Sequence, residues 1–174
     1  MEYYIRPVRV EDAEGINALR RMPGVFENIL GMPSERIKRN SDHLMNLGEN
    51  EYQFVACTAS AEGGELVIGT AGLSVGVNRT RHKGSIGIMV HRGYQNMGVG
   101  TALMEALLDV ADNWLRLVRV ELDVFTDNAP AIHIYEKLGF VIEGTKRKEA
   151  IRSGEYVDAY LMARIKAEQN SINI

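Results

Sequence analysis

The chain has 174 residues, of which 45% are hydrophobic and 25% charged, and its formal net charge is −3 at pH 7. This length and composition predict a single domain over residues 1–174 with a full hydrophobic core. No basic excess is available to neutralise a nucleic-acid backbone, so we expect no DNA or RNA partner. No apolar run is long enough to span a membrane, so we expect no membrane partner and a cytoplasmic protein.

Hydrophobic spacing and turn residues predict the elements of the N-terminal half. Ser34 is a good N-cap for a helix, and the Gly63-Gly64 pair between two strand-like runs predicts a hairpin. In chain order we expect an edge strand over 2–7, a helix over Asp12–Arg21, a second helix from Ser34 to Gly48, and strands over Tyr52–Ala59 and Glu65–Val77.

The C-terminal half mixes strands and helices without a regular alternation, which favours a mixed sheet covered by helices. Asp127 or Asn128 caps a short helix that has Pro130 in its first turn and ends at Gly139. The expected elements are strands over Gly84–Val90, Val118–Val124, Phe140–Gly144 and Tyr156–Ile165, a helix beginning at 99–101, and a frayed tail over 165–174.

The most informative stretch runs from Gly84 to Gly100, where an apolar strand leads into a glycine-rich loop and then directly into a helical pattern. Free backbone N–H groups and the positive end of the helix dipole meet at that point. The arrangement predicts an anion site, most often for phosphate.

Two familiar phosphate loops do not fit this stretch. A Walker loop needs Lys and a hydroxyl residue where Val99 and Gly100 stand, so nucleotide hydrolysis is rejected. A Rossmann fingerprint needs a third glycine where Leu103 stands, so dinucleotide binding is a weak interpretation.

Two motifs instead resemble the GNAT (Gcn5-related) N-acetyltransferase superfamily. The first is Gln95-Asn-Met-Gly98-Val-Gly100, which matches the Gln/Arg-x-x-Gly-x-Gly/Ala loop of that family. The second is Asn128-Ala-Pro-Ala131, followed by Tyr135 and then by Leu-Gly-Phe at 138–140. The resemblance covers nearly the whole chain, and the C-terminal third is most similar to the bacterial YhhY-type branch, which is associated with acetylation of L-amino acids.

The resemblance implies an α+β fold with a mostly antiparallel twisted sheet of six to seven strands and about four flanking helices. A splayed parallel strand pair would form the cleft for acetyl-coenzyme A, with no metal, and the protein would be a homodimer. The residues expected to bind acetyl-coenzyme A are Ile88, Met89, Val90, Gln95, Asn96, Met97, Gly98, Val99, Gly100, Thr101 and Asn128. Asn128 is equally interpretable as a plain helix cap.

Tyr135 stands where the family places its general acid, seven residues after Asn128. An unperturbed tyrosine is protonated at neutral pH and can donate a proton to a leaving thiolate. Many relatives carry a carboxylate in the strand before the loop, but this chain has Ser85, Gly87 and Met89 there. The general base therefore stays open, with Glu121, Asp123, His82 and Glu27 as the candidates.

The leading hypothesis is acetyl transfer by direct attack of a small primary amine, favouring an L-amino acid because an α-amine with a pKa of about 8 is already partly neutral. Alternatives are a protein N-terminus or lysine, a polyamine, and a non-catalytic acyl-coenzyme A sensor. Selectivity is expected near the connector Phe26–Met32, the second helix and the hairpin Arg147–Tyr156. An apolar acceptor pocket would use Phe26, Met32, Tyr156 and Tyr160, which could equally be core or dimer contacts, and a carboxylate clamp would use Arg152 or Arg36.

Overall fold

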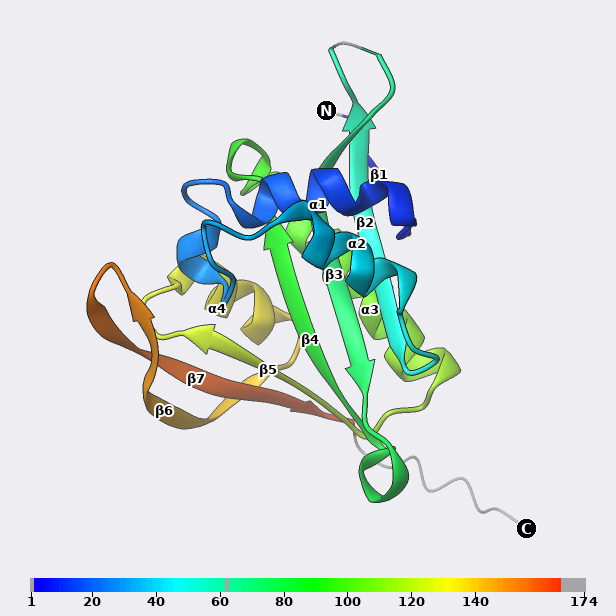
Figure 1. The fold of residues 1–174 in the computed structure, drawn as a ribbon. Helices are drawn as coiled ribbons and strands as arrows, with labels where there is room; N and C mark the ends of the chain where they lie inside the picture. Colours follow the sequence, from blue (N-terminus) through cyan, green and yellow to red (C-terminus); the bar gives the residue numbers. More distant parts are fainter. Residues whose placement is uncertain (1, 62, 167–174) are drawn as a thin grey trace.

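A seven-stranded mixed sheet forms the centre of the protein in this computed structural model, which describes residues 2–61 and 63–166 (Figure 1). The strand order is β1-β2-β3-β4-β5-β7-β6, and every neighbouring pair is antiparallel except the parallel pair β4–β5. The strands are β1 (Tyr4–Pro7), β2 (Glu51–Ala59), β3 (Glu65–Val75), β4 (Lys83–Val90), β5 (Arg119–Phe125), β6 (Val141–Arg152) and β7 (Glu155–Ile165).

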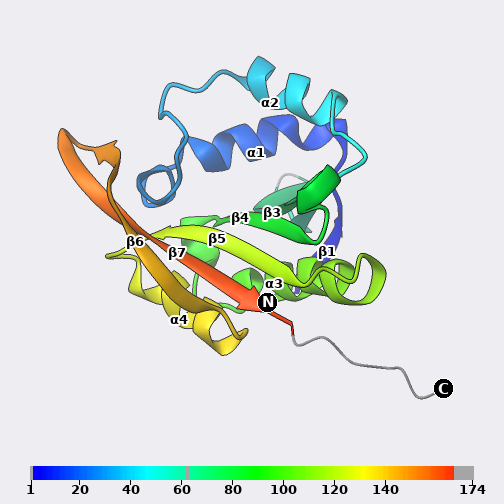
Figure 2. The same cartoon turned by 90° about the horizontal axis from the view of Figure 1, so that it is seen from below.

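Helices cover both faces of the sheet (Figure 2). One face carries α1 (Ala13–Arg20) and α2 (Ile37–Met45), and the other carries α3 (Val99–Asp109) and α4 (Ala129–Lys137). Each face buries its own hydrophobic cluster, because strand side chains alternate between the two sides. The α1–α2 cluster contains Ile16, Leu19, Val55, Cys57 and Met89, whereas the α3–α4 cluster contains Ile86, Leu103, Leu107, Leu122 and Phe140.

The parallel pair β4–β5 is joined only at one end. Residues 83–85 of β4 pair with residues 119–121 of β5, and no further register connects the two strands. Beyond that point β4 stays bonded to β3 as far as Val90, while β5 stays bonded to β7 as far as Phe125. The two halves of the sheet therefore diverge as a V, which Figure 1 shows between β4 and β5. The expected mixed fold with a splayed parallel pair is confirmed.

The hairpin predicted at Gly63-Gly64 is confirmed, since Ala59 pairs with Glu65. The prediction that Ser34 caps the second helix is wrong: α2 begins at Ile37, and Arg36 is its N-cap. The physical reason lies in Glu35, whose carboxylate is held by Arg20 and whose carbonyl accepts a hydrogen bond from Asn17. These tertiary contacts keep the preceding residues out of the helix.

The sixth strand is much longer than its expected end at Gly144. It continues to Arg152 through two register irregularities and then turns at Ser153-Gly154, which both have positive φ angles of 51° and 86°. Of the tail expected over 165–174, Ile165 pairs with Arg119 and the Lys166 N–H donates to the Val118 carbonyl. Residues 167–174 lie outside the described residues.

Candidate active site

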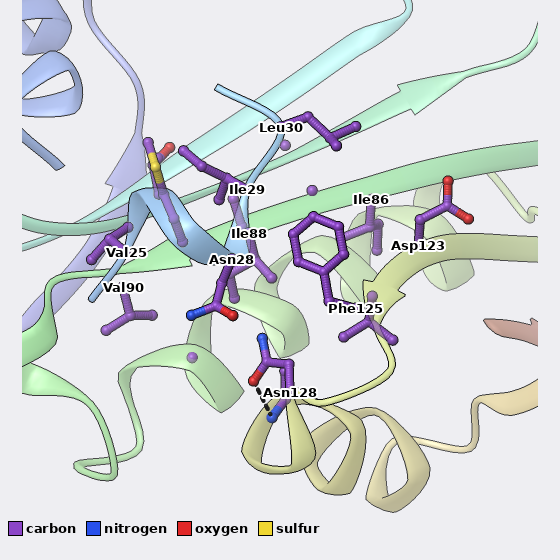
Figure 3. Close-up of a pocket in the computed structure, with 18 of the residues that line it drawn as sticks. Val25, Asn28, Ile29, Leu30, Ile86, Ile88, Val90, Asp123, Phe125 and Asn128 are labelled. Carbon is purple, nitrogen blue, oxygen red and sulfur yellow. Dashed lines mark hydrogen bonds between the residues drawn. The ribbon is translucent and has the colours of Figure 1, made fainter. Parts of the chain in front are cut away.

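A cavity of about 850 Å³ occupies the V between β4 and β5 (Figure 3). It reaches both faces of the sheet, because its lining comes from the α3 and α4 N-terminal turns on one side and from the α1–α2 connector on the other. Ile88, Val90 and Asn128 mark the first side, while Asn28 and Leu30 mark the second. One continuous space can therefore hold two reactants that approach from opposite faces of the sheet.

The loop before α3 is shaped as an anion cradle. Asn96 and Gly98 have positive φ angles of 59° and 83°, and Gly98 is the N-cap of α3. Ala102 makes the first intrahelical hydrogen bond, to the Gly98 carbonyl, so the N–H groups before it point out of the helix end. The Gln95 side chain donates to the Val90 carbonyl at 3.2 Å and ties the loop to β4. A diphosphate fits such a helix N-terminus without any basic side chain.

The expected donor-binding residues divide into two groups. Met97 is about half exposed, Gly98 shapes the turn, and Val99 is buried in the core. These three residues and Thr101 do not line the cavity, so any contact they make with a diphosphate would be through the loop backbone. The predicted residues that line the cavity are Ile88, Met89, Val90, Gln95, Asn96, Gly100, Asn128 and Tyr135.

Tyr135 projects from α4 into the cavity lining, with only 7% of its surface exposed. Its ring packs on Phe140, with 6.0 Å between the ring centroids. Burial disfavours the phenolate and raises the pKa of Tyr135 to about 12. The hydroxyl therefore keeps its proton at neutral pH and can act only as a donor of that proton. About two turns earlier, at the start of the helix, the Asn128 side chain caps α4 by accepting from the Ala131 N–H at 3.4 Å.

Three of the four candidate bases lie outside the cavity lining. Glu121 is held by Lys83 at 3.1 Å and Arg119 at 2.7 Å; partial burial acts to raise its pKa, but these hydrogen bonds outweigh burial and lower it. The Glu27 carboxylate accepts a hydrogen bond from the Gly24 N–H. The His82 backbone carbonyl accepts hydrogen bonds from the N–H groups of Val118 and Arg119. Asp123 is the one candidate that lines the cavity.

The acceptor side differs from the expected apolar pocket. None of Phe26, Met32, Tyr156 and Tyr160 is among the cavity-lining residues, and neither is Arg36 or Arg152. The three segments expected to set selectivity do contribute to the lining: Asn28, Ile29 and Leu30 come from the connector, Asn40 and His43 from the second helix, and Glu149 from the hairpin. Sequence reasoning named none of these residues individually, and it did not place Gly72 in the site. For the part of the cavity formed by β3 and β4, the only signal in the sequence is the absence of side chains at Gly72 and Gly87.

Arg152 lies beside this pocket, where it contacts the lining residues Phe125 and Asp127 without itself lining the cavity. Its guanidinium makes a bidentate ion pair with Asp127, lies 5.3 Å from the ring centroid of Phe125, and donates to the Glu27 carbonyl. These contacts join the β6–β7 hairpin to the α1–α2 connector. The hydrogen bonds of Arg152 lower the pKa of Asp127 and keep it ionised.

The described residues contain neither a metal-binding cluster nor a membrane-spanning helix. Across 2–61 and 63–166, no group of three or more His, Cys, Asp or Glu side chains is placed to hold a metal ion. Over the same ranges, every helix is too short or too polar to cross a bilayer.

Comparison with known proteins places the chain among acetyltransferases. The profile of the acetyltransferase (GNAT) family matches residues 22–140. The L-amino acid N-acetyltransferase AaaT of Escherichia coli is 42% identical over 95% of this chain and 99% of that protein, and the spermidine N(1)-acetyltransferase of the same organism is 27% identical over 91% and 83%. A GNAT acetyltransferase from Streptococcus pneumoniae superposes with a TM-score of 0.78 at 25% identity, covering 95% of this chain and 100% of that one. The chain belongs to the GNAT acetyltransferase family.

Proposed function

We propose that this acetyltransferase uses acetyl-coenzyme A to acetylate the α-amine of a free L-amino acid, and that residues 1–174 form one catalytic domain. The observation that carries the proposal is the cavity between β4 and β5, which joins the anion cradle of α3 to a polar pocket on the opposite face. Such a passage lets donor and acceptor meet without sharing an entrance.

In this proposal the donor lies along the α3–α4 side of the V. Its diphosphate accepts hydrogen bonds from the backbone between Gln95 and Thr101, where the helix dipole favours negative charge. Its pantetheine amides pair with the β4 backbone at Ile88–Val90, because the edge of β4 that faces β5 is unpaired there. Asn128 lies close enough to line the same space.

The transfer itself needs a polarised carbonyl and a proton for the leaving sulfur. A β4 N–H facing the thioester oxygen would supply the first, and removal of one such donor in other enzymes costs about a hundredfold or more. Tyr135 would supply the second, since its raised pKa keeps the hydroxyl protonated. A direct attack then requires no covalent acyl-enzyme.

Two findings support an amino acid as the acceptor. The relative named for L-amino acids is 42% identical over nearly the whole of both chains. An α-amine with a pKa of about 8 also needs less help to lose a proton than a polyamine or lysine amine does. A polyamine is the second candidate, because Asp123, Asp127 and Glu149 give the acceptor side three carboxylates and a spermidine acetyltransferase is also similar.

A substrate panel tests this assignment. Release of free coenzyme A is followed with free amino acids, spermidine, and peptides with free N-termini, at saturating acetyl-coenzyme A. We expect the highest kcat/KM with a free L-amino acid. Faster turnover of spermidine or of peptides would overturn the acceptor, and tight donor binding without any transfer would indicate a sensor.

We further propose a homodimer that acts in the cytoplasm, where acetyl-coenzyme A is formed and used. The outer strand β6 has one unpaired edge, and Val141 and Ile151 near its two ends are 60% and 70% exposed, which offers a second copy a strand edge and two apolar contacts. Sedimentation at micromolar concentration should give twice the chain mass of 19.4 kDa. A monomer under those conditions would contradict the dimer.

A further inference from the structure

On the acceptor side of the cavity, the sheet carries no side chains at Gly72 and Gly87, and these two residues form what is here called the Gly72–Gly87 floor. Gly72 of β3 and Gly87 of β4 lie directly opposite each other in the antiparallel register. Their neighbours Ala71, Leu73 and Ile86 belong to the α3–α4 cluster, so the two glycines face the α1–α2 side. A Cβ added at Gly87 would meet no atom within 4 Å. The sheet is therefore open at the place where a second reactant can reach the V.

Asp123 stands beside that floor. Ser85 and Glu121 are the last paired residues of β4 and β5, and Gly87 and Asp123 lie two residues further along the diverging strands. Leu122 and Val124 point into the α3–α4 cluster, so Asp123 points to the opposite face. In Figure 3 the Asp123 side chain turns toward the same side as Leu30 and away from Asn128. The carboxylate thus belongs to the acceptor half of the cavity.

One oxygen of this carboxylate is available. Lys146 binds Oδ2 of Asp123 at 2.6 Å, and no residue of the described chain hydrogen-bonds Oδ1. The other candidate bases are held in ion pairs or lie outside the cavity. The charged and titratable groups that face Asp123 or share its cavity are Lys146, Glu149, Glu121, Asp127, Arg20, His43 and Tyr135.

We propose that the acceptor ammonium binds over the Gly72–Gly87 floor and gives its proton to Asp123, so that β5 supplies the base that β4 lacks. This inference rests on the proposed function. A residue on β5 can serve because the absence of a side chain at Gly87 leaves the space between Asp123 and the thioester open to the amine, either directly or through one water.

In the proposed transfer, each bond that forms is matched by one that breaks. The ammonium loses one proton to Oδ1 of Asp123, and the amine nitrogen uses its lone pair to form a bond with the thioester carbonyl carbon. The C–S bond breaks and its electron pair goes to sulfur, which takes the proton of the Tyr135 hydroxyl. The second proton of the nitrogen returns to Tyr135, and the proton on Asp123 leaves to water. The products are the N-acetyl compound and free coenzyme A.

The test compares Asp123→Asn with Glu121→Gln, a matched control on the same strand and face that does not line the cavity. Near neutral pH, Asp123→Asn should lower kcat/KM for the amine about a hundredfold, the usual range for loss of a general base. The defect should shrink as the pH rises past the pKa of the amine, because a neutral amine needs no base. Glu121→Gln should stay within about threefold of the unmodified protein, far below that range.

A second pair of variants tests the floor. Gly87→Ala should raise the KM of the amine about tenfold, as one misplaced methyl group does in a substrate pocket, and leave the KM of acetyl-coenzyme A unchanged. Gly144→Ala is the control, since its added Cβ also meets nothing within 4 Å and Gly144 does not line the cavity.

Full activity of Asp123→Asn at neutral pH, or an equal loss at every pH, would overturn the role of Asp123 as a base. An unchanged amine KM in Gly87→Ala would overturn the floor. Absence of turnover by the unmodified protein with any amine would overturn the proposed function itself, which is a different result from either.

Discussion

Tyr135 is the residue on which the chemical step is expected to depend most. Tyr135→Phe keeps the ring and its contact with Phe140 and removes only the hydroxyl, so the fold should be retained. We expect kcat to fall about a hundredfold, since loss of a positioned acid commonly costs that much. The KM of acetyl-coenzyme A should change little.

The matched control for that variant is Tyr160→Phe, because Tyr160 packs on the same cluster without lining the cavity. Coenzyme A release and circular dichroism are measured on both proteins. Equal kcat values for the two variants would contradict a catalytic role for Tyr135.

The raised pKa of Tyr135 predicts its behaviour in alkali. Its folded pKa of about 12 lies above the unfolded value of 10.0, so its contribution to stability is fully present below about pH 10 and is lost as the pH rises through 12. The number of ionised tyrosines, measured by tyrosinate absorbance, should therefore be the same in the unmodified protein and in Tyr135→Phe up to about pH 11. Above about pH 11 the unmodified protein should show one more ionised tyrosine than the variant. Separation near pH 10 would contradict the burial of the hydroxyl.

At the scale of elements, the turn into α3 depends on a left-handed backbone that glycine adopts without strain. Gly98→Ala at φ +83° should cost about 1 kcal/mol of stability. It should also raise the KM of acetyl-coenzyme A, because the strained loop no longer aims its N–H groups at the diphosphate. Thermal unfolding and steady-state kinetics measure the two effects.

Gly139→Ala offers a closely matched control for the α3 turn. Gly139 ends α4 with φ +88°, and its added Cβ would meet only Arg164 at 3.8 Å or more. The same backbone strain therefore arises away from the anion cradle. Gly139→Ala should lose similar stability with an unchanged KM of acetyl-coenzyme A, and an equal rise in both variants would contradict the specific role of the α3 turn.

Some of these elements could be predicted from sequence and others could not. The loop at 95–101, the cap Asn128 and Tyr135 follow local motifs, so their positions on a loop and a helix were accessible from the sequence. A strand was expected over Phe140–Gly144, but the full length of β6 was missed because most of its side chains are exposed, which leaves no alternation of hydrophobic residues to detect. The connector, the second helix and the hairpin were expected on the acceptor side, but the individual lining residues were not identified, because they come from β3, β4, β5, β6, α2 and a connector and only tertiary packing brings them together.

At the scale of the whole molecule, partly buried ion pairs determine the response to acid. The hydrogen bond and charge of Arg164 lower the pKa of Asp112; burial acts to raise the pKa of Asp12 and of Glu121, but their arginine partners outweigh it. A lowered folded pKa contributes stability above the unfolded value of about 4, and this contribution is lost as the pH falls through the folded value.

Stability measured by thermal unfolding should therefore change little between about pH 5 and about pH 9 and should decline steeply below about pH 4. Asp112→Asn should flatten part of that decline, because its pair with Arg164 no longer titrates. A stability that stays constant down to pH 3 would contradict the contribution of these pairs.

The three-residue seam between β4 and β5 has a mechanical consequence. The strands within each half-sheet pair with one another over most of their length, but the halves share only residues 83–85 and 119–121. A pantetheine arm bound along β4 would take the place of a strand between β4 and β5 and would connect the two half-sheets. Donor binding would then make the sheet more rigid. A donor at a hundred times its dissociation constant adds about 2.7 kcal/mol to the free energy of unfolding, and the reduction in local motion should be largest where the β4–β5 pairing ends.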